Sequence, residues 1–424
     1  MQRNYFMVVL IFIVFFVISL ITNILGPLIP DIIKSFNLNL TLVSFLPFSF
    51  FIAYGVMSIP AGMLVEKYHE KIVMLWAFII ELSGAFLFAL FPSYVVALAS
   101  LFLLGIGMAI LQVAINPLLR VAGGEEHFAF NSVLAQLIFG SASFLSPFIY
   151  SYLVTNISDK NQSQNFLIST LSSLVPENLP WISLYWLFAV LILIMVVVIY
   201  LSNFPKVTRK EDEQFGVWET HKNLFKMKTV ILFFLGIFAY VGTEQGIANW
   251  ISQFLYVYHG YDPLNVGSTI VSYFWGLLTL GCMLGLVLLK IFDSRKVLVW
   301  FSISALFWLS TALWGSTYFF GINLALISFP MAGFSLSVMW SIIFSLALNS
   351  VDSHHGSFSG ILCTAIIGGA VVPLVIGWLG DLFGLRTGML VIYITLGYIL
   401  SIGIWAKPII TNETIASKKE TVGE

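Results

Sequence analysis

The chain has 424 residues, of which 59% are hydrophobic and only 9% are charged. A soluble domain carries about 25% charged residues, so this composition indicates a membrane protein. The net charge of −1 offers no basic field for nucleic acid. The two cysteines lie in apolar runs without the spacing of a disulfide framework or a zinc site. Phosphate-binding glycine loops, nucleophile elbows and zinc motifs are absent from the sequence. We therefore expect no enzyme, cofactor, metal or nucleic-acid partner.

Twelve apolar runs follow one another along the chain, each long enough to cross the roughly 30 Å hydrocarbon core as a helix. The first run is too long for the core of a signal peptide and is expected to remain as a helix. The fold class predicted is an all-α membrane protein with spans at residues 6–29, 42–65, 72–92, 94–119, 128–153, 181–202, 229–256, 265–289, 297–316, 321–349, 357–380 and 387–406.

Lys and Arg residues lie between the runs, mostly on one side. The side that carries the N-terminus collects 16 of the 19, and the other side holds only Lys34, Lys160 and Arg386. Positively charged loops stay in the cytoplasm. The pattern therefore predicts a multi-pass protein of the cytoplasmic membrane with both termini on the cytoplasmic side.

A charged segment after the sixth run divides the chain into two parts. We predict an N-terminal six-helix half at 1–202, a linker at 203–228, a C-terminal six-helix half at 229–406 and a cytoplasmic tail at 407–424. A repeat supports this division, because a glycine is followed by Lys at +5 and an acid at +8 after span 2 and again after span 8, 223 residues later.

The repeated loops have two interpretations. Their charges can merely fix the topology, or they can pair in one conformation and separate in another. Two copies at matching places favour gating loops. The residues concerned are Gly62, Glu66, Lys67, Lys71, Gly285, Lys290, Asp293 and Arg295.

Several short motifs, spread over both halves, resemble one known family. They are SIPAG at 58–62, ILQVAINP at 110–117, LAQ at 134–136, YVGTE at 240–244, IFSLAL at 343–348 and IGGAVVP at 367–373. Together with the loop that begins at Gly62, they resemble the fucose–glucose–galactose group of sugar cotransporters in the major facilitator superfamily. The resemblance implies two six-helix halves that rock around a central cavity lined by spans 1, 4, 7 and 10.

Span 4 carries amides where such a cavity is expected. Gln112 and Asn116 are four residues apart and share a helical face, and Pro117 is expected to break the helix behind them. Sugars need amide donors and acceptors for their hydroxyls and an aromatic surface for the ring. The alternative for each side chain is a bond that holds helices together. The expected sugar-binding set is Asn23, Gln112, Asn116, Gln136, Trp250, Trp275 and Trp340.

The sequence departs from the fucose branch of this family at its acidic positions. That branch places acids in spans 1 and 4, whereas this chain has Asn23 and Gln112 there. Pro47 also replaces a usual Gln. The proton pathway of that branch therefore cannot be transferred to this chain, and the motifs of spans 4 and 7 look more like the glucose/galactose branch.

Two carboxylates lie deep within predicted spans, Glu81 and Glu244. Acids at such depth are candidates for function by default. Glu244 lies on span 7, one turn after Tyr240, and is assigned to ion coupling, with a structural anchor as the alternative. Glu81 lies on the peripheral span 3, and we expect a structural role for it.

The sequence thus predicts a secondary active transporter of a small sugar, coupled to H⁺ or Na⁺ through Glu244 and acting as a monomer in the bilayer. The side chains of Gln245 and Asn249 point away from Glu244 on a regular helix, which favours a proton over sodium. The alternatives are a passive sugar uniporter and a non-transporting membrane sensor.

Overall fold

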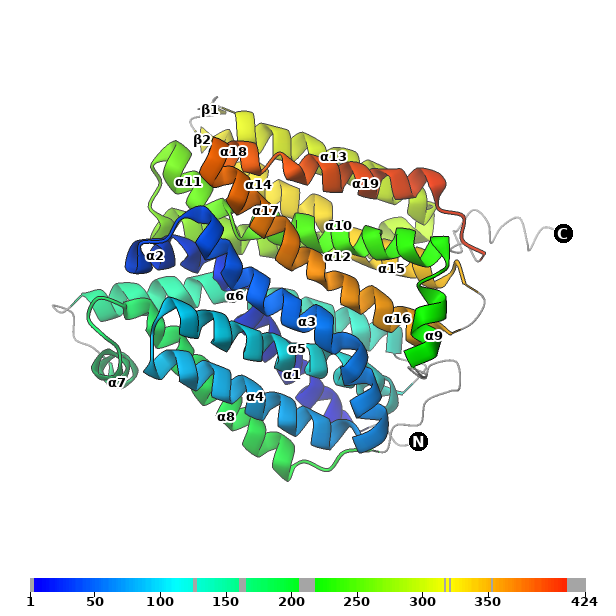
Figure 1. Ribbon diagram of the computed structural model, residues 1–424, viewed down its shortest axis with the longest axis horizontal. Coiled ribbons are helices and arrows are strands. Elements are labelled where there is room, and N and C mark those ends of the chain that lie inside the picture. The colour runs from blue at the N-terminus through cyan, green and yellow to red at the C-terminus, as the bar shows by residue number, and fades with distance from the viewer. Residues whose placement is uncertain are drawn as a thin grey trace.

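A computed structural model describes residues 4–124, 128–159, 165–205, 218–315, 318–319, 322–351 and 354–409. Within these residues, twelve helical segments are long and apolar enough to cross a membrane. They lie side by side as an elongated bundle (Figure 1). An even number of spans returns the chain to its starting face, so Asn4 and Ile409 both lie at what we call the terminal face of the bundle. The other end is called the opposite face.

The first six spans come from eight helices, because span 1 is broken and a short helix precedes span 6. They are α1 (Tyr5–Thr22) with α2 (Leu25–Phe36), α3 (Leu40–Tyr68), α4 (Glu70–Leu90), α5 (Tyr94–Gly123), α6 (Phe128–Ser158), and the 3-10 turn η2 (Pro180–Ile182) with α8 (Ser183–Leu201). The helix α7 (Phe166–Leu174) lies in the loop before η2 at the opposite face.

The last six spans contain more breaks. They are α10 (Lys228–Ala248) followed by α11 (Ile251–His259), the π-helical turn η4 (Pro263–Gly267) with α12 (Ser268–Ile291), α13 (Ser294–Trp314), α14 (Leu324–Leu336) with α15 (Met339–Leu348), α16 (His355–Thr364) with η5 (Ala365–Ile367) and α17 (Gly368–Phe383), and α18 (Leu385–Gly388) with α19 (Val391–Trp405). A short helix α9 (Trp218–Leu224) precedes α10, and β1 (Tyr318–Phe319) pairs antiparallel with β2 (Ile322–Asn323) before α14.

The twelve predicted spans are confirmed, with ends that shift by a few residues. One local prediction is wrong: α5 continues through position 117 to Gly123, so the proline there does not end the helix. The predicted linker holds α9, which packs against α16, and its residues 206–217 lie outside the described part.

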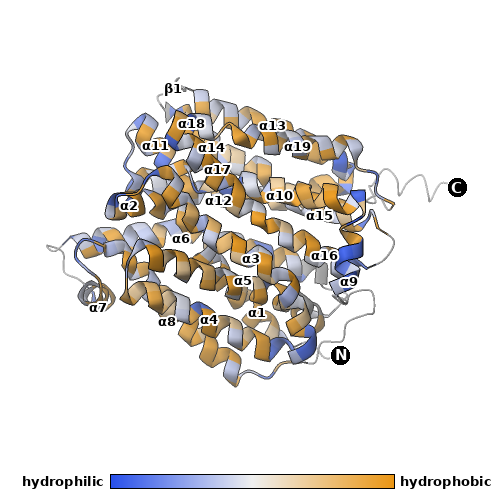
Figure 2. Ribbon diagram, viewed as in Figure 1, coloured by the Kyte–Doolittle hydropathy of each residue, from blue (hydrophilic) through white to orange (hydrophobic). Residues whose placement is uncertain are grey.

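Hydrophobic residues predominate along the helices, whereas hydrophilic residues gather at the two ends of the bundle (Figure 2). Val95, Ile394 and Ile404 expose 72%, 74% and 76% of their surface. Such exposure would be costly in water but suits lipid. Helices suit the same environment because every backbone group is bonded within its own segment.

Side-chain caps begin many of these helices. Asn39 accepts a hydrogen bond from the Leu42 backbone N–H at the start of α3, and Asn323 does the same for Ala325 at the start of α14. Asn and Asp are favoured at this position because their oxygens satisfy backbone donors that the first helical turn leaves unpaired.

Several helix contacts join the first six spans to the last six: α3 packs along α16 and α17, α6 packs along α12, and α2 packs against α11. Glycines permit this closeness. A Cβ atom placed on Gly377 of α17 would lie 2.6 Å from the Leu40 carbonyl oxygen of α3. At the same end, Asp381 of α17 accepts hydrogen bonds from the backbone N–H groups of Leu40 and Thr41 at 2.9 and 2.8 Å.

Candidate functional site

A carboxylate and a phenol form a pair on α10. The Tyr240 hydroxyl donates to Oε1 of Glu244 across 3.0 Å, as their spacing of one turn permits. Tyr240 is buried at 3% exposure, and Glu244 is half-buried. The pair therefore places a titratable carboxyl group on a membrane-spanning helix, with a hydrogen-bond donor fixed beside it.

An aromatic side chain of α15 approaches this pair. The ring of Trp340 lies 6.0 Å from the ring of Tyr240, and it stacks on Phe344 with 5.7 Å between centroids. Cys282 of α12 donates through Sγ to the Ser337 carbonyl at the α14–α15 break. The structure therefore brings together three predicted residues: Tyr240, Glu244 and Trp340.

Asn23 stands at the break between α1 and α2, where it belongs to a separate polar cluster. Its Nδ2 donates to Oγ of Ser143 on α6 at 2.8 Å, and this hydroxyl lies 2.7 Å from Oγ of Ser19. All three side chains are buried. The cluster holds the α1–α2 break against α6. Asn23 therefore makes a hydrogen bond that stabilises the packing of these helices.

The break between α1 and α2 lies against the break between α10 and α11. A Cβ atom on Gly26 of α2 would lie 2.4 Å from the carbonyl oxygen of Ala248, the last residue of α10. Only glycine allows this approach. The breaks of spans 1 and 7 are therefore in direct backbone contact.

The other predicted sugar-binding residues differ in exposure. Gln112 of α5 is half-buried, whereas Gln136 of α6 is exposed. Trp250 and Trp275 are buried at 1% and 4% exposure, and no partner accepts from their indole N–H groups in the described structure. The side chain of Asn116 lies outside the described residues.

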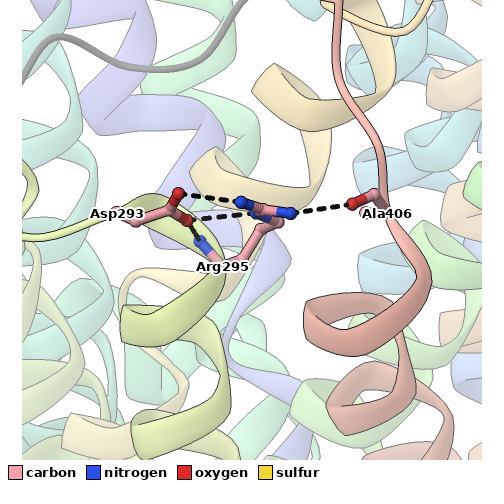
Figure 3. Close-up of polar contacts among 3 residues, drawn as sticks. All are labelled: Asp293, Arg295 and Ala406. Atoms are coloured by element: carbon pink, nitrogen blue, oxygen red, sulfur yellow. Dashed lines mark hydrogen bonds and ion pairs between the residues drawn. The ribbon is translucent and has the colours of Figure 1, made fainter.

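The two charged loops lie at the terminal face but form different contacts. Lys71 donates through Nζ to the Ser202 carbonyl at 2.7 Å. Lys67 lies 5.0 Å from the ring centre of Tyr68. In the second loop, Asp293 caps α13 and pairs with Arg295 at 3.1 Å, and Arg295 also reaches the Ala406 carbonyl (Figure 3).

Hydrogen bonds from Arg295 hold the pKa of Asp293 below its ordinary range. A carboxylate with a lowered pKa contributes its stabilisation above that range and loses it only as the pH falls through the lowered value. The pair is therefore charged at every physiological pH. It therefore cannot act as a pH sensor.

Glu81 of α4 is fully buried, and neither of its carboxylate oxygens has a hydrogen-bond partner in the described structure. A Cβ atom on Gly107 of α5 would lie 2.2 Å from its Cγ. The side chain therefore fills the contact between α4 and α5.

Some residues near the site were not predicted. Ser19 lies one helical turn before Asn23, and this spacing could have identified it from the sequence as a neighbour of Asn23. Ser143 and Cys282 come from other helices, so no sequence spacing relates them to their partners. Thr243, next to Glu244 in the chain, bonds to another helix, since its hydroxyl lies 2.6 Å from that of Thr395 on α19.

Comparison with known proteins identifies the class. The family model of the Major Facilitator Superfamily matches residues 11–366, and the chain belongs to that family of transporters. It is 30% identical to a glucose/galactose transporter of Brucella abortus biovar 1 (strain 9-941) over 95% of both chains.

The fucose:proton symporter of E. coli is similar to this chain in both sequence and fold. The L-fucose-proton symporter of Escherichia coli (strain K12) is 24% identical over 87% of this chain and 86% of its own. A crystal structure of the E. coli fucose:proton symporter superposes with a TM-score of 0.67 and 21% identity, covering 96% of this chain and all of the other, 100%. The predicted major facilitator fold and the predicted relationship to the fucose–glucose–galactose group are both confirmed.

Proposed function

We propose that the protein is a secondary active transporter that carries a small neutral sugar by alternating access and couples this movement to H⁺ or Na⁺. The similarity to a protein named a glucose/galactose transporter, 30% identical over 95% of both chains, supports the choice of substrate class. Residues 1–202 and 229–406 are the two halves that would move against each other, joined by the linker at 203–228.

The observation that carries the coupling is the pair of Tyr240 and Glu244. A charged acid at the centre of a membrane helix costs about 2.5–3.5 kcal/mol, so a half-buried carboxylate in a span needs a compensating role. Glu244 has a donor at 3.0 Å and the aromatic surface of Trp340 close to that donor. Because Asn23 and Gln112 are neutral, Glu244 is the group assigned to ion binding.

The charge distribution supports an orientation. With 16 of 19 Lys and Arg on the side that carries the N-terminus, we assign the terminal face to the cytoplasm and the protein to the cytoplasmic membrane. The opposite face would then open to the outside.

A passive uniporter is the second candidate, and the same contact favours it. Tyr240 donates to Glu244 and fixes the orientation of its carboxylate. A carboxylate fixed in this way can accept a hydrogen bond from a sugar hydroxyl without any change in its charge. In this candidate, no ion moves with the sugar.

Counterflow in proteoliposomes tests the substrate class without reference to coupling. Vesicles that contain the purified protein are loaded with unlabelled D-glucose, D-galactose, L-fucose or D-mannose and then exposed to a trace of the same labelled sugar. At least one sugar is expected to show transient accumulation that empty vesicles lack. Absence of counterflow for every monosaccharide would contradict the proposal.

A further inference from the structure

A cavity of about 270 Å³ lies at the terminal face, between the start of α13 and the end of α19. Its wall combines an ion pair, a further cation and apolar residues: Asp293, Arg295, Lys296, Val299, Trp300 and Gly403. The two helices are close here, since a Cβ atom on Gly403 would lie 2.5 Å from Cγ2 of Val299. None of the residues assigned to sugar or ion binding lines this cavity.

Arg295 is held in a fixed orientation at the cavity. Its Nε and Nη2 donate to the two carboxylate oxygens of Asp293 at 3.2 and 3.1 Å, and its Nη1 donates to the Ala406 carbonyl at 3.4 Å (Figure 3). A guanidinium carries five N–H donors, so these three bonds leave two N–H groups for a further acceptor. The side chain is 36% exposed, so a ligand in the cavity can reach them.

Lys296 brings a second positive charge to the wall. It makes no hydrogen bond or ion pair with any residue that the structure describes. Asp293 is the one acid of the wall, so the net charge there is 2 − 1 = +1. Lys290 and Lys407 lie nearby in the sequence, and residues 290–300 and 403–409 contain no other acid. The charge of this region therefore favours an anionic ligand.

The cavity opens beside an apolar stripe that suits lipid chains. Trp300 is 48% exposed, with its ring edge-on to that of Phe292 at 5.0 Å between centroids. Ile303 and Phe307 follow at helical spacing on the same side of α13 and expose 53% and 57% of their surface. Trp is enriched where helices leave the hydrocarbon core. The cavity therefore lies at the level where lipid headgroups meet acyl chains.

We propose that this cavity binds an anionic phospholipid of the cytoplasmic leaflet. Lys296 and the two remaining N–H groups of Arg295 contact the phosphate oxygens, and the stripe that begins at Trp300 receives an acyl chain. The cytoplasmic leaflet holds the anionic lipids, and basic pockets between helices on that side suit their headgroups. The inference uses the orientation assigned above, but it involves neither the sugar nor the coupling ion.

Lipid binding to the purified protein tests this site. Native mass spectrometry of the detergent-solubilised protein, titrated with dioleoyl phosphatidylglycerol or dioleoyl phosphatidylcholine, gives a dissociation constant for the first bound lipid. Wild type should bind phosphatidylglycerol about fivefold more tightly or better, because one basic residue near an anionic surface is worth about that factor. Lys296→Gln should lose this preference, and Lys296→Arg should keep it. Lys296 is not among the predicted gating residues, so the variants test lipid binding apart from gating.

Lys222→Gln is the matched control. It removes the same charge from the same face, but Lys222 is exposed on α9, which packs against α16. Thermal unfolding of the same samples gives a second readout, since a ligand that binds only the folded protein raises the melting temperature. Phosphatidylglycerol should raise the melting temperature of wild type and Lys222→Gln more than that of Lys296→Gln. Inorganic phosphate at equal concentration and ionic strength should raise none of them.

Three results would overturn the proposal. Equal affinity of wild type for the two lipids would show that the cavity does not recognise the anionic headgroup. An equal loss of preference in Lys296→Gln and Lys222→Gln would indicate the general positive field of the face. A rise in melting temperature with inorganic phosphate as large as with phosphatidylglycerol would assign the cavity to a soluble anion. No sugar is used in these measurements, so their failure and a failure of counterflow are independent.

Discussion

At the scale of single residues, Glu81 shows most plainly how burial and bonding decide between roles. Its side chain has no exposure and no partner for either oxygen in the described structure, and it fills the contact with Gly107. A buried carboxyl without a partner is costly, and an apolar side chain of similar shape removes that cost.

We therefore expect Glu81→Met to keep transport and to raise the melting temperature, because Met fills the same space without a polar group. Thermal unfolding of the purified variant in detergent measures the second effect, and Glu81→Gln serves as the control that keeps polarity. Loss of transport in a well-folded Glu81→Met protein would show that this carboxyl has a functional role.

Gln112 tests the sugar contact on α5. An amide offers both a donor and an acceptor to a hydroxyl, and loss of one buried bond costs about 1–3 kcal/mol. Gln112→Ala should raise the dissociation constant for sugar roughly tenfold, since 1.4 kcal/mol is a factor of ten. Binding and melting temperature are measured on one preparation, and unchanged affinity with a clearly lower melting temperature would assign Gln112 to helix packing instead.

At the scale of elements, the two ends of the bundle carry related turns. The turn after α17 repeats the turn after α3 with an offset of 377 − 62 = 315 residues. His69 and Gly384 occupy corresponding positions and share an unusual backbone, with φ and ψ of 65° and 157° against 86° and 148°. The aligned pairs are Gly62 with Gly377, Glu66 with Asp381, His69 with Gly384 and Lys71 with Arg386.

Asp381 holds the opposite face together. Besides the two backbone N–H groups of α3, it accepts from the Thr41 hydroxyl, and a carboxylate at a helix N-terminus is favoured by the helix dipole. Removing a capping side chain costs about 0.5–2 kcal/mol. Because Asp381 is exposed, we expect the low end of that range.

Asp381→Ala should therefore favour the state in which the opposite face is open, by roughly two- to tenfold in population. Hydrogen–deuterium exchange should rise in peptides that cover the start of α3 and the end of α17, and stay level at the terminal face. Ser83→Ala is the control, since its exposed hydroxyl bonds only within α4. Equal exchange in wild type and Asp381→Ala would show that this contact does not hold the face closed.

The loops at the terminal face give a kinetic prediction. Lys67 and Lys290 end the helices α3 and α12 on that face, away from the α10–α11 break. Lys67→Ala and Lys290→Ala should each slow transport with little change in sugar affinity, because a gating loop changes the rate of conversion between states. Transport rates and dissociation constants are compared on the same variants, and a large affinity loss at a normal rate would indicate direct substrate contact.

At the scale of the whole molecule, the hydropathy of the sequence was sufficient to predict most of the fold. The twelve spans were predictable because lipid requires long apolar helices, and the relationship to sugar cotransporters followed from motifs in both parts of the chain. The breaks within spans 7 and 10 were not predictable, since Asn249 and Ser337 lie in apolar runs of the sequence that look continuous.

The candidate site was only partly predictable. Tyr240 and Glu244 were found because one helical turn separates them. The Ser143 partner of Asn23 and the approach of Trp340 to Tyr240 depend on contacts between helices, which a single sequence does not encode as a spacing.

Glu244 lies on α10, which packs against both α17 and α19. If this carboxyl binds the coupling ion, it takes up a proton or pairs with a sodium ion in one state of the bundle and releases that ion in the other. Glu244→Gln keeps the size and a hydrogen bond to Tyr240 but cannot take up a proton or balance a cation.

Uphill accumulation of sugar in proteoliposomes tests this central claim most directly. Vesicles with wild-type protein or Glu244→Gln receive an inward pH gradient, an inward sodium gradient or no gradient, and the labelled sugar selected by counterflow is followed over time. The wild type should concentrate sugar under one of the two gradients, and Glu244→Gln should lose accumulation under that gradient while it keeps counterflow. Normal accumulation by Glu244→Gln, or equilibration of the wild type to the same level under all three conditions, would contradict it.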